Sequence, residues 1–121
     1  MIRYLYCVKR AAGISPEEFA RLWQGESFVG MVKRTAALYK AENWSMGLGL
    51  AVEANLTILE MSDSEPPYDG MIEYNWQNGS DLASIFQSKE GIKLNKEMTD
   101  YQSSFVDFDA SPQFFMQTED G

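Results

Sequence analysis

A helix start is encoded at residues 15–18, where the chain reads Ser-Pro-Glu-Glu shortly after a segment typical of a β-strand. Serine is a favoured N-cap residue, proline fits the first helical position, and a glutamate three residues after the serine completes a capping box. Residues 2–9, which precede this start, carry β-branched and aromatic side chains with apolar residues on both faces, which predicts a central strand. The chain is therefore expected to fold around strand–helix units.

Hydrophobic periodicity predicts the other elements. The helix after the cap changes its apolar face by roughly a quarter-turn beyond Gly25, so we expect a break at residues 25–27. Further along we expect a weak strand at 38–44, a loop at 46–50, a short helix at 51–61, a strand at 71–76, a helix capped at 78–80 and interrupted at Gly91, a helical segment over 94–101, and a last strand at 113–117.

The resulting order, β-α-β-(α)-β-α-β, predicts an α+β fold: a ferredoxin-like four-stranded antiparallel sheet with helices on one face. The 121 residues are the size of one domain, residues 1–121, in which we expect an insertion at residues 46–67. Such a sheet leaves its second face uncovered, and we expect the aromatic-rich strands to make that face apolar. Two copies packed sheet to sheet would bury it, which predicts a homodimer.

The composition excludes several kinds of chemistry. The chain has no histidine and one cysteine, which excludes Ser-His-Asp or Cys-His catalysis, histidine-ligated zinc or haem, and an internal disulfide. Its net charge of −8 disfavours binding to nucleic acid. No carboxylate spacing indicates a metal site and no glycine-rich loop indicates a nucleotide site, so we expect no metal and no cofactor. The chain lacks a membrane-spanning apolar run and an export signal, so we expect no membrane partner and a cytoplasmic location.

Several short motifs occur in a fixed order along nearly the whole chain. They are Lys9-Arg10, Ser15-Pro16-Glu17-Glu18-Phe19, Trp23 four residues on, Tyr68-Asp69-Gly70, Phe105-Val106-Asp107 and the aromatic last segment from Ser111 to Phe115. In this order the chain resembles the EthD-domain proteins of the dimeric α+β barrel superfamily. The resemblance implies a dimeric α+β barrel, and we expect a pocket for a small molecule between the helices and the sheet of each protomer.

One position departs from the family pattern, because the family's histidine four residues after the tryptophan falls on Ser27 here. The resemblance implies a role in oxidative, degradative or tailoring metabolism of aromatic or polyketide-like compounds. The first hypothesis is a cofactor-independent, oxidoreductase-associated or tailoring enzyme, or a degenerate one. The alternative is a non-catalytic binding or accessory protein that delivers an apolar compound to an oxygenase, and a third reading is an oligomerisation module.

Two residues next to the expected helix break are the candidates for catalysis. Glu26 would be a base with a raised pKa if a straight helix buried it, and would face solvent if the break turned it outward. Ser27 has no histidine to activate it, so we expect a hydrogen-bonding residue of the pocket rather than a nucleophile.

The candidates for ligand binding are mostly aromatic. Trp23 would either pack in the core or form the wall of an apolar cavity, and Arg10 would either pair with Asp107 or bind a ligand oxyanion. The tyrosines and tryptophans of the strands suit a pocket for a small apolar or aromatic ligand, and they suit a dimer interface equally well. The full set of ligand-binding candidates is Tyr6, Arg10, Trp23, Ser27, Tyr39, Trp44, Tyr74 and Trp76.

Overall fold

The computed structural model describes residues 1–50, 53–63, 66–78 and 82–119. Within them, the strands form one antiparallel sheet in the order β2-β3-β1-β4. Their bounds are β1 (Ile2–Val8), β2 (Asn43–Leu48), β3 (Gly70–Trp76) and β4 (Gln113–Gln117). The prediction of a central first strand is confirmed, because β1 pairs with β3 on one side and with β4 on the other.

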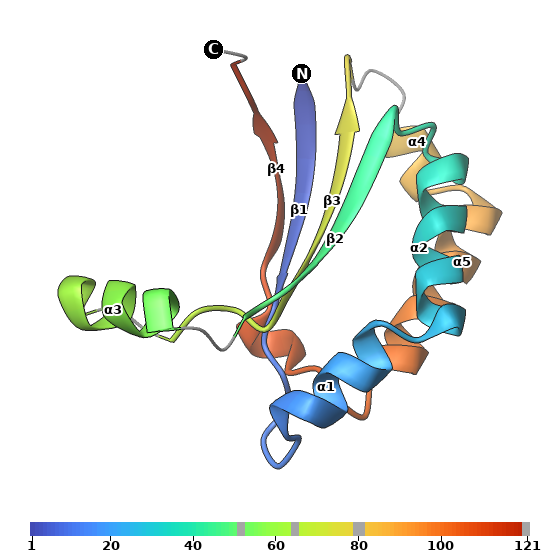
Figure 1. The fold of residues 1–121 in the computed structure, drawn as a ribbon. Helices are drawn as coiled ribbons and strands as arrows, with labels where there is room; N and C mark the ends of the chain where they lie inside the picture. The colour runs from blue at the N-terminus through green and yellow to red at the C-terminus, as the bar shows by residue number, and fades with distance from the viewer. Residues whose placement is uncertain (51–52, 64–65, 79–81, 120–121) are drawn as a thin grey trace.

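Most of the described helices cover one face of the sheet (Figure 1). They are α1 (Pro16–Trp23), α2 (Glu26–Leu38), α4 (Leu82–Phe86) and α5 (Lys89–Gln102), and a 3₁₀ turn, η1 (Phe108–Ala110), leads into β4. The remaining helix, α3 (Glu53–Ser62), stands apart at the end of the sheet, on the side that the other helices leave uncovered (Figure 1). The predicted α+β fold, a ferredoxin-like antiparallel sheet with helices on one face, is confirmed.

The helix start and the helix break lie where the sequence places them. The Ser15 hydroxyl accepts a hydrogen bond from the Glu18 N–H at 3.1 Å, so the serine is the N-cap of α1. α1 ends at Trp23 and α2 begins at Glu26, with Gly25 as its N-cap. The break allows α1 and α2 to turn different apolar faces toward the sheet.

The prediction for the second strand is wrong in its position. α2 continues to Leu38, and β2 occupies residues 43–48, so the expected strand at 38–44 and the expected loop at 46–50 are both displaced. The alternation within this segment is weak, and the pairing with β3 decides the register instead: Trp44 lies opposite Tyr74, and Met46 lies opposite Ile72. The first residues of the expected insertion at 46–67 therefore belong to the sheet.

The last two helices also differ from the prediction at one boundary. Gly91 lies inside the first turn of α5 rather than interrupting a helix, because Ser88 caps α5 and its hydroxyl accepts a hydrogen bond from the Gly91 N–H at 3.0 Å. A side chain at position 91 would collide with the Ile85 carbonyl, so the glycine permits the close approach of α4. The expected cap at 78–80 lies partly outside the described residues, as does the start of the expected helix at 51–61, whose described part is α3.

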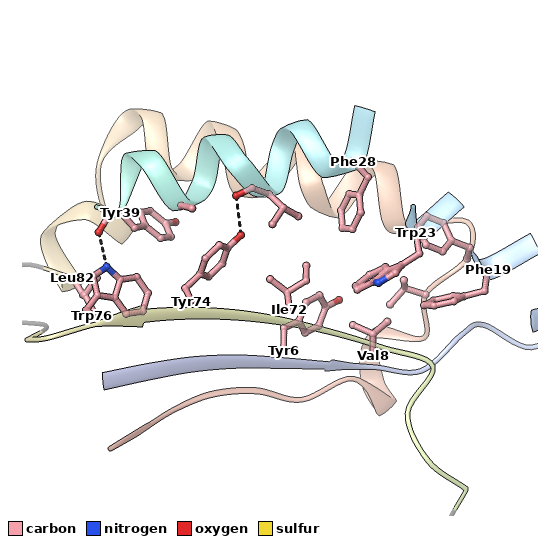
Figure 2. Close-up of a cluster of buried hydrophobic side chains, with 14 residues drawn as sticks. Tyr6, Val8, Phe19, Trp23, Phe28, Tyr39, Ile72, Tyr74, Trp76 and Leu82 are labelled. Carbon is pink, nitrogen blue, oxygen red and sulfur yellow. Dashed lines mark hydrogen bonds between the residues drawn. The ribbon is translucent and has the colours of Figure 1, made fainter. Parts of the chain in front are cut away.

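Most of the strand aromatics lie on the face opposite to the one expected. Figure 2 shows Tyr6, Tyr74 and Trp76 pointing from the sheet toward the helices, and the strand register puts Tyr4 on the same face. The face without helices, called the uncovered face below, is of mixed polarity. Its residues are Arg3, Leu5 and Cys7 of β1, Asn43, Ser45 and Gly47 of β2, Met71, Glu73 and Asn75 of β3, and Phe114 and Met116 of β4. The expectation that the aromatic-rich strands make this face apolar is wrong, because the strand aromatics other than those of β4 point toward the helices and polar residues share the uncovered face with Phe114.

Trp23 of α1 packs closely against Gly70 at the start of β3. A Cβ atom at position 70 would lie 2.8 Å from the Trp23 indole, whereas one at Gly47 would have its nearest neighbour at 3.8 Å. Replacement Gly70→Ala is therefore expected to lower the free energy of unfolding by about 1–3 kcal/mol, since the indole must shift within a packed core. Chemical denaturation of this variant beside Gly47→Ala, which should be near neutral, checks the prediction. Equal losses in both variants would contradict it.

Candidate functional site

A cavity of about 130 Å³ lies between the sheet and the helix layer. Its floor is formed by the buried side chains Tyr6, Thr35, Tyr39, Ile72, Tyr74 and Gln102. Its mouth is formed by the exposed residues Asn95, Thr99, Phe108 and Gln113, and the half-buried Tyr4, Phe86 and Met98 lie between mouth and floor. The cavity thus leads from solvent, between α5 and β4, to the centre of the core.

Tyrosine hydroxyls form the main polar groups of the cavity. The Tyr6 hydroxyl donates to the Gln102 side-chain oxygen at 2.9 Å, and the Tyr4 hydroxyl donates to the Gln113 side-chain oxygen at 2.6 Å. The Tyr74 hydroxyl donates to the Val32 carbonyl at 3.3 Å, as the dashed line in Figure 2 shows. A hydroxyl that donates one bond keeps lone pairs with which to accept another, so these oxygens remain acceptors for a ligand.

Contacts between aromatic rings, and a buried glutamine, fix the positions of the cavity tyrosines. Tyr4 stacks on Tyr74 with the ring centroids 5.6 Å apart, and Tyr39 contacts Phe86 edge to face at 4.5 Å. Gln102, on the last turn of α5, is 3% exposed, and its amide nitrogen donates to the Met98 carbonyl at 3.0 Å. Both ends of that amide are therefore bonded, which fixes the acceptor for Tyr6 in place.

Burial keeps the tyrosines of the cavity protonated. It raises the pKa of Tyr6 to about 12, and it also raises the pKa of Tyr39. The pKa values of Tyr4 and Tyr74 are raised mainly by burial too, and the neighbouring tyrosines add to the shift, because a second phenolate nearby would repel the first. At neutral pH each of these groups is a neutral hydroxyl.

The cavity is uncharged. Among the described residues, none that lines it is an aspartate, glutamate, lysine or arginine. It therefore offers hydrogen-bonding groups and aromatic surface, but no ion pair to a charged ligand.

Three of the predicted ligand-binding residues line this cavity: Tyr6, Tyr39 and Tyr74. The tryptophans do not. Trp76 is buried beside the floor, where its indole N–H donates to the Tyr39 carbonyl at 2.7 Å (Figure 2). Trp44 is half-buried against the core, and Trp23 is 1% exposed in the core, with its indole N–H donating to the Gly47 carbonyl at 2.9 Å. The packing alternative therefore describes Trp23 better than the cavity-wall alternative.

Arg10 is held in a structural pair, but its partner is not the expected Asp107. Its Nε atom lies 3.4 Å from a carboxylate oxygen of Asp69, and its backbone N–H donates to the other oxygen at 2.9 Å. A third bond runs from its guanidinium to the Ile14 carbonyl at 2.9 Å. Arg10 instead borders a separate surface groove between the turn after β1 and α3.

The two catalytic candidates lie at the start of α2. Glu26 and Ser27 are both exposed, and neither lines the cavity. The break at Gly25 has turned Glu26 to solvent, which is the second of the two alternatives considered for it.

Sequence reasoning missed more than half of the lining. Tyr4, one of the strand tyrosines expected at either a pocket or a dimer interface, shares a strand face with Tyr6 and lines the cavity with it. Asn95 and Thr99 each follow directly on an inward-facing residue of α5, Leu94 and Met98. Polar residues that border an apolar helical stripe in this way could have been predicted to line a pocket at the edge of the core. Thr35, Phe108 and Gln113 join the site only through tertiary packing, and their sequence neighbours give no signal for it.

No family model matches the chain, and no curated protein sequence matches it. Solved structures of similar fold do exist. At3g17210 of Arabidopsis thaliana is 11% identical with a TM-score of 0.63, and the match covers 100% of this chain and 98% of that one. A dimeric ferredoxin-like protein of unknown function from Bacteroides fragilis is 11% identical, with a TM-score of 0.60 and coverages of 97% and 95%.

A hydroxynitrile lyase from Passiflora edulis is 12% identical, with a TM-score of 0.56 and coverages of 99% and 96%. At these identities the similarity extends to the arrangement of the backbone and not to the chemistry of the site. The comparisons and the sheet topology together show a ferredoxin-like α+β fold that this chain shares, over nearly its full length, with proteins known to be dimeric.

None of the described helices is both long and apolar enough to cross a membrane.

Proposed function

We propose that the chain binds a small, neutral organic molecule in the cavity between its sheet and its helices. The single observation that carries this proposal is a solvent-accessible cavity, lined by tyrosine hydroxyls and amides and lacking charged residues among the described part of its lining. In line with the EthD resemblance, the molecule would belong to oxidative, degradative or tailoring metabolism.

The size of the cavity limits the ligand. An apolar cavity of about 150 Å³ in another protein holds one benzene molecule. A cavity of about 130 Å³ therefore suits a single ring or a short branched chain, with any longer part of the ligand extending through the mouth.

The polar groups point to a hydroxyl-bearing ligand. The tyrosine oxygens on the floor already donate to protein acceptors, so they have lone pairs to offer a ligand O–H. At the mouth, the side-chain amides of Asn95 and Gln113 supply N–H donors. A neutral alcohol or phenol can satisfy both kinds of partner, whereas a carboxylate or an ammonium would lose its hydration without a counter-charge.

The same lining favours binding over acid–base catalysis. A general base works best with a pKa near the operating pH, but burial raises the pKa of Tyr6 to about 12 and keeps its neighbours protonated. The carboxylate that sequence reasoning offered as a base, Glu26, is exposed and lies outside the cavity lining. Of the functions considered, the non-catalytic binding or accessory protein is therefore the one we propose.

The test uses three probes of one shape: benzyl alcohol, benzoate and benzylamine. We expect benzyl alcohol to bind and to shift the NMR signals of Met98 and Tyr74, while the two charged probes bind at least roughly tenfold more weakly. Tyr74→Phe should weaken the binding of benzyl alcohol roughly fivefold, which is the loss of one ordinary hydrogen bond. Equal affinity for all three probes would contradict the proposal.

A second variant blocks the cavity without touching its floor. Thr99 is exposed at the mouth, so Thr99→Trp should leave the fold intact and reduce binding roughly tenfold or more by filling the opening. Lys93→Trp is the matched control, because Lys93 is exposed on α5 and does not line the cavity. Equal effects of the two tryptophans would show that the probe binds elsewhere.

We also propose that the protein is a homodimer joined through the uncovered face of the sheet. The exposed Phe114 and Met116 of β4 are 42% and 40% accessible there, and dimeric proteins with the same fold support the assembly. Sedimentation velocity tests it directly: we expect twice the protomer mass of 13.7 kDa at micromolar concentration, and a monomer would refute the dimer.

A further inference from the structure

We infer that α3 is an arm that packs on the second copy of the chain. α3 stands apart from the helix layer and projects on the side of the uncovered face (Figure 1). This inference rests on the proposed dimer, and it assigns to α3 a contact that the sheet face alone does not provide.

The helix carries apolar residues on two opposite sides. Leu56 and Leu59 border the groove between α3 and the turn after β1, while Ile58 and Met61, one turn apart, point the other way. Ile58 is 62% exposed and Met61 is 82% exposed. Polar residues separate the two apolar sides, and on the groove side Leu56 is also 61% exposed. The apolar surface of α3 that the protomer leaves uncovered therefore includes Ile58 and Met61, and exposed apolar surface of this kind marks an interaction site.

The short length of α3 also indicates that this helix needs a packing partner. Isolated helices shorter than about 12–15 residues are marginal in water, and most helices in proteins are stabilised by packing of an apolar side. α3 has 10 residues, and among the described residues it meets the turn after β1 along the groove that Leu56 and Leu59 border. A partner on the other side would supply the missing stabilisation.

The uncovered face is a small surface on which to build a dimer. Four strands about 4.8 Å apart and roughly 20 Å long outline roughly 400 Å² in projection, which is a lower bound on their accessible surface. A stable interface buries about 800 Å² of accessible surface per partner, so a further contact from α3 would strengthen it. Part of this face is also polar, because Asn75 accepts from the Arg3 guanidinium at 2.9 Å and donates to the Asn43 side chain at 2.6 Å.

The apolar part of the uncovered face lies at the end from which α3 departs. Cys7 of β1 lies opposite Met71 of β3. This pair is next to the pair of Val8 and Gly70, at which β3 begins. Phe114 lies opposite Leu5, next to them. The polar group of Arg3 and Asn75 occupies the opposite end of the strands. α3 projects from this same end of the sheet (Figure 1), so a second copy seated on the apolar part of the uncovered face would lie on the side to which α3 projects.

Ile58→Glu tests the arm, with Ile92→Glu as its matched control. Both isoleucines are equally exposed, 62% on α3 and 60% on α5, so neither substitution should unfold the protomer. We expect Ile58→Glu to weaken dimerisation at least roughly tenfold in sedimentation equilibrium, because it places a charge in the interface, and we expect Ile92→Glu to leave it unchanged. Circular dichroism of both variants checks that the protomer is folded.

Amide hydrogen exchange of the wild-type chain gives an independent measurement. The amides of residues 53–62 should be protected at concentrations where the dimer forms and should exchange rapidly on dilution below its dissociation constant, while the amides of β1 and β3 stay protected. A dimer of unchanged affinity in Ile58→Glu, an equal loss in Ile92→Glu, or exchange of α3 independent of concentration would overturn the arm and leave the dimer standing. A monomeric wild-type chain would overturn the dimer and the arm together.

Discussion

Replacement of Trp23 by alanine is expected to lower the free energy of unfolding by about 3–5 kcal/mol, the loss usual for a large aromatic side chain removed from a packed core. The indole is 1% exposed and contacts the rings of Phe19 and Phe28, with centroids 5.3 and 5.1 Å away. Its N–H donates to the Gly47 carbonyl at 2.9 Å, so the substitution also removes that hydrogen bond. A loss of this size is a large part of the stability of an ordinary domain.

Trp44 provides the control for this prediction. It is the same residue type, but it is half-buried at the edge of the core on β2. Trp44→Ala should therefore cost less than about 2 kcal/mol, and urea denaturation of both variants gives the comparison. If Trp23→Ala were the milder change, or if it left stability intact, the assignment of Trp23 to the core would be wrong.

The second large effect is unfolding at alkaline pH. In the unfolded chain the tyrosine pKa is about 10. In the folded chain burial raises the pKa of Tyr6 to about 12, and the pKa values of Tyr4 and Tyr74 are raised as well. Because the folded state holds these protons more tightly, their stabilising contribution is complete below pH 10 and is lost as the pH rises toward the folded-state values.

The magnitude follows from the number of groups. Each raised tyrosine removes up to about 1.4 kcal/mol of stability per pH unit, so three remove about 4 kcal/mol per unit above pH 10. Denaturation followed by circular dichroism at a series of pH values, with tyrosinate absorbance recorded in parallel, should show steep loss of stability over this range. In Tyr74→Phe one titrating group is absent, so the slope should be shallower by about 1.4 kcal/mol per unit. Parallel slopes in the two proteins would contradict the prediction.

Local signals in the sequence predicted much of the fold. The cap at Ser15 and the break at Gly25 depend on hydrogen bonds and apolar spacing within one or two turns, and both lie where predicted. β2 was misplaced because its position depends on pairing with β3, a contact between residues about 30 positions apart. The capping of α5 at Ser88 was missed because a glycine at position 91 was interpreted as a break.

The candidate site was predictable only in part. Alternation along the strands selected Tyr6 and Tyr74, which do line the cavity. Whether a strand face meets the helices or lies uncovered is decided by tertiary packing, so the sequence left the pocket and the dimer interface as equal alternatives for these aromatics. Ser27 was selected by the family pattern alone, and the start of α2 holds it on the surface.

The connection between β2 and β3 has a consequence for how such a chain can change. Leu48 pairs with Gly70, and the Gly49 N–H still donates to the Asp69 carbonyl at 2.8 Å, so the hairpin ladder is closed before the chain reaches α3. The register of the two strands does not depend on how many residues lie between them. Lineages with this fold can therefore lengthen, shorten or exchange that connection as a module, while the tyrosine-lined cavity at the other side of the sheet stays the same.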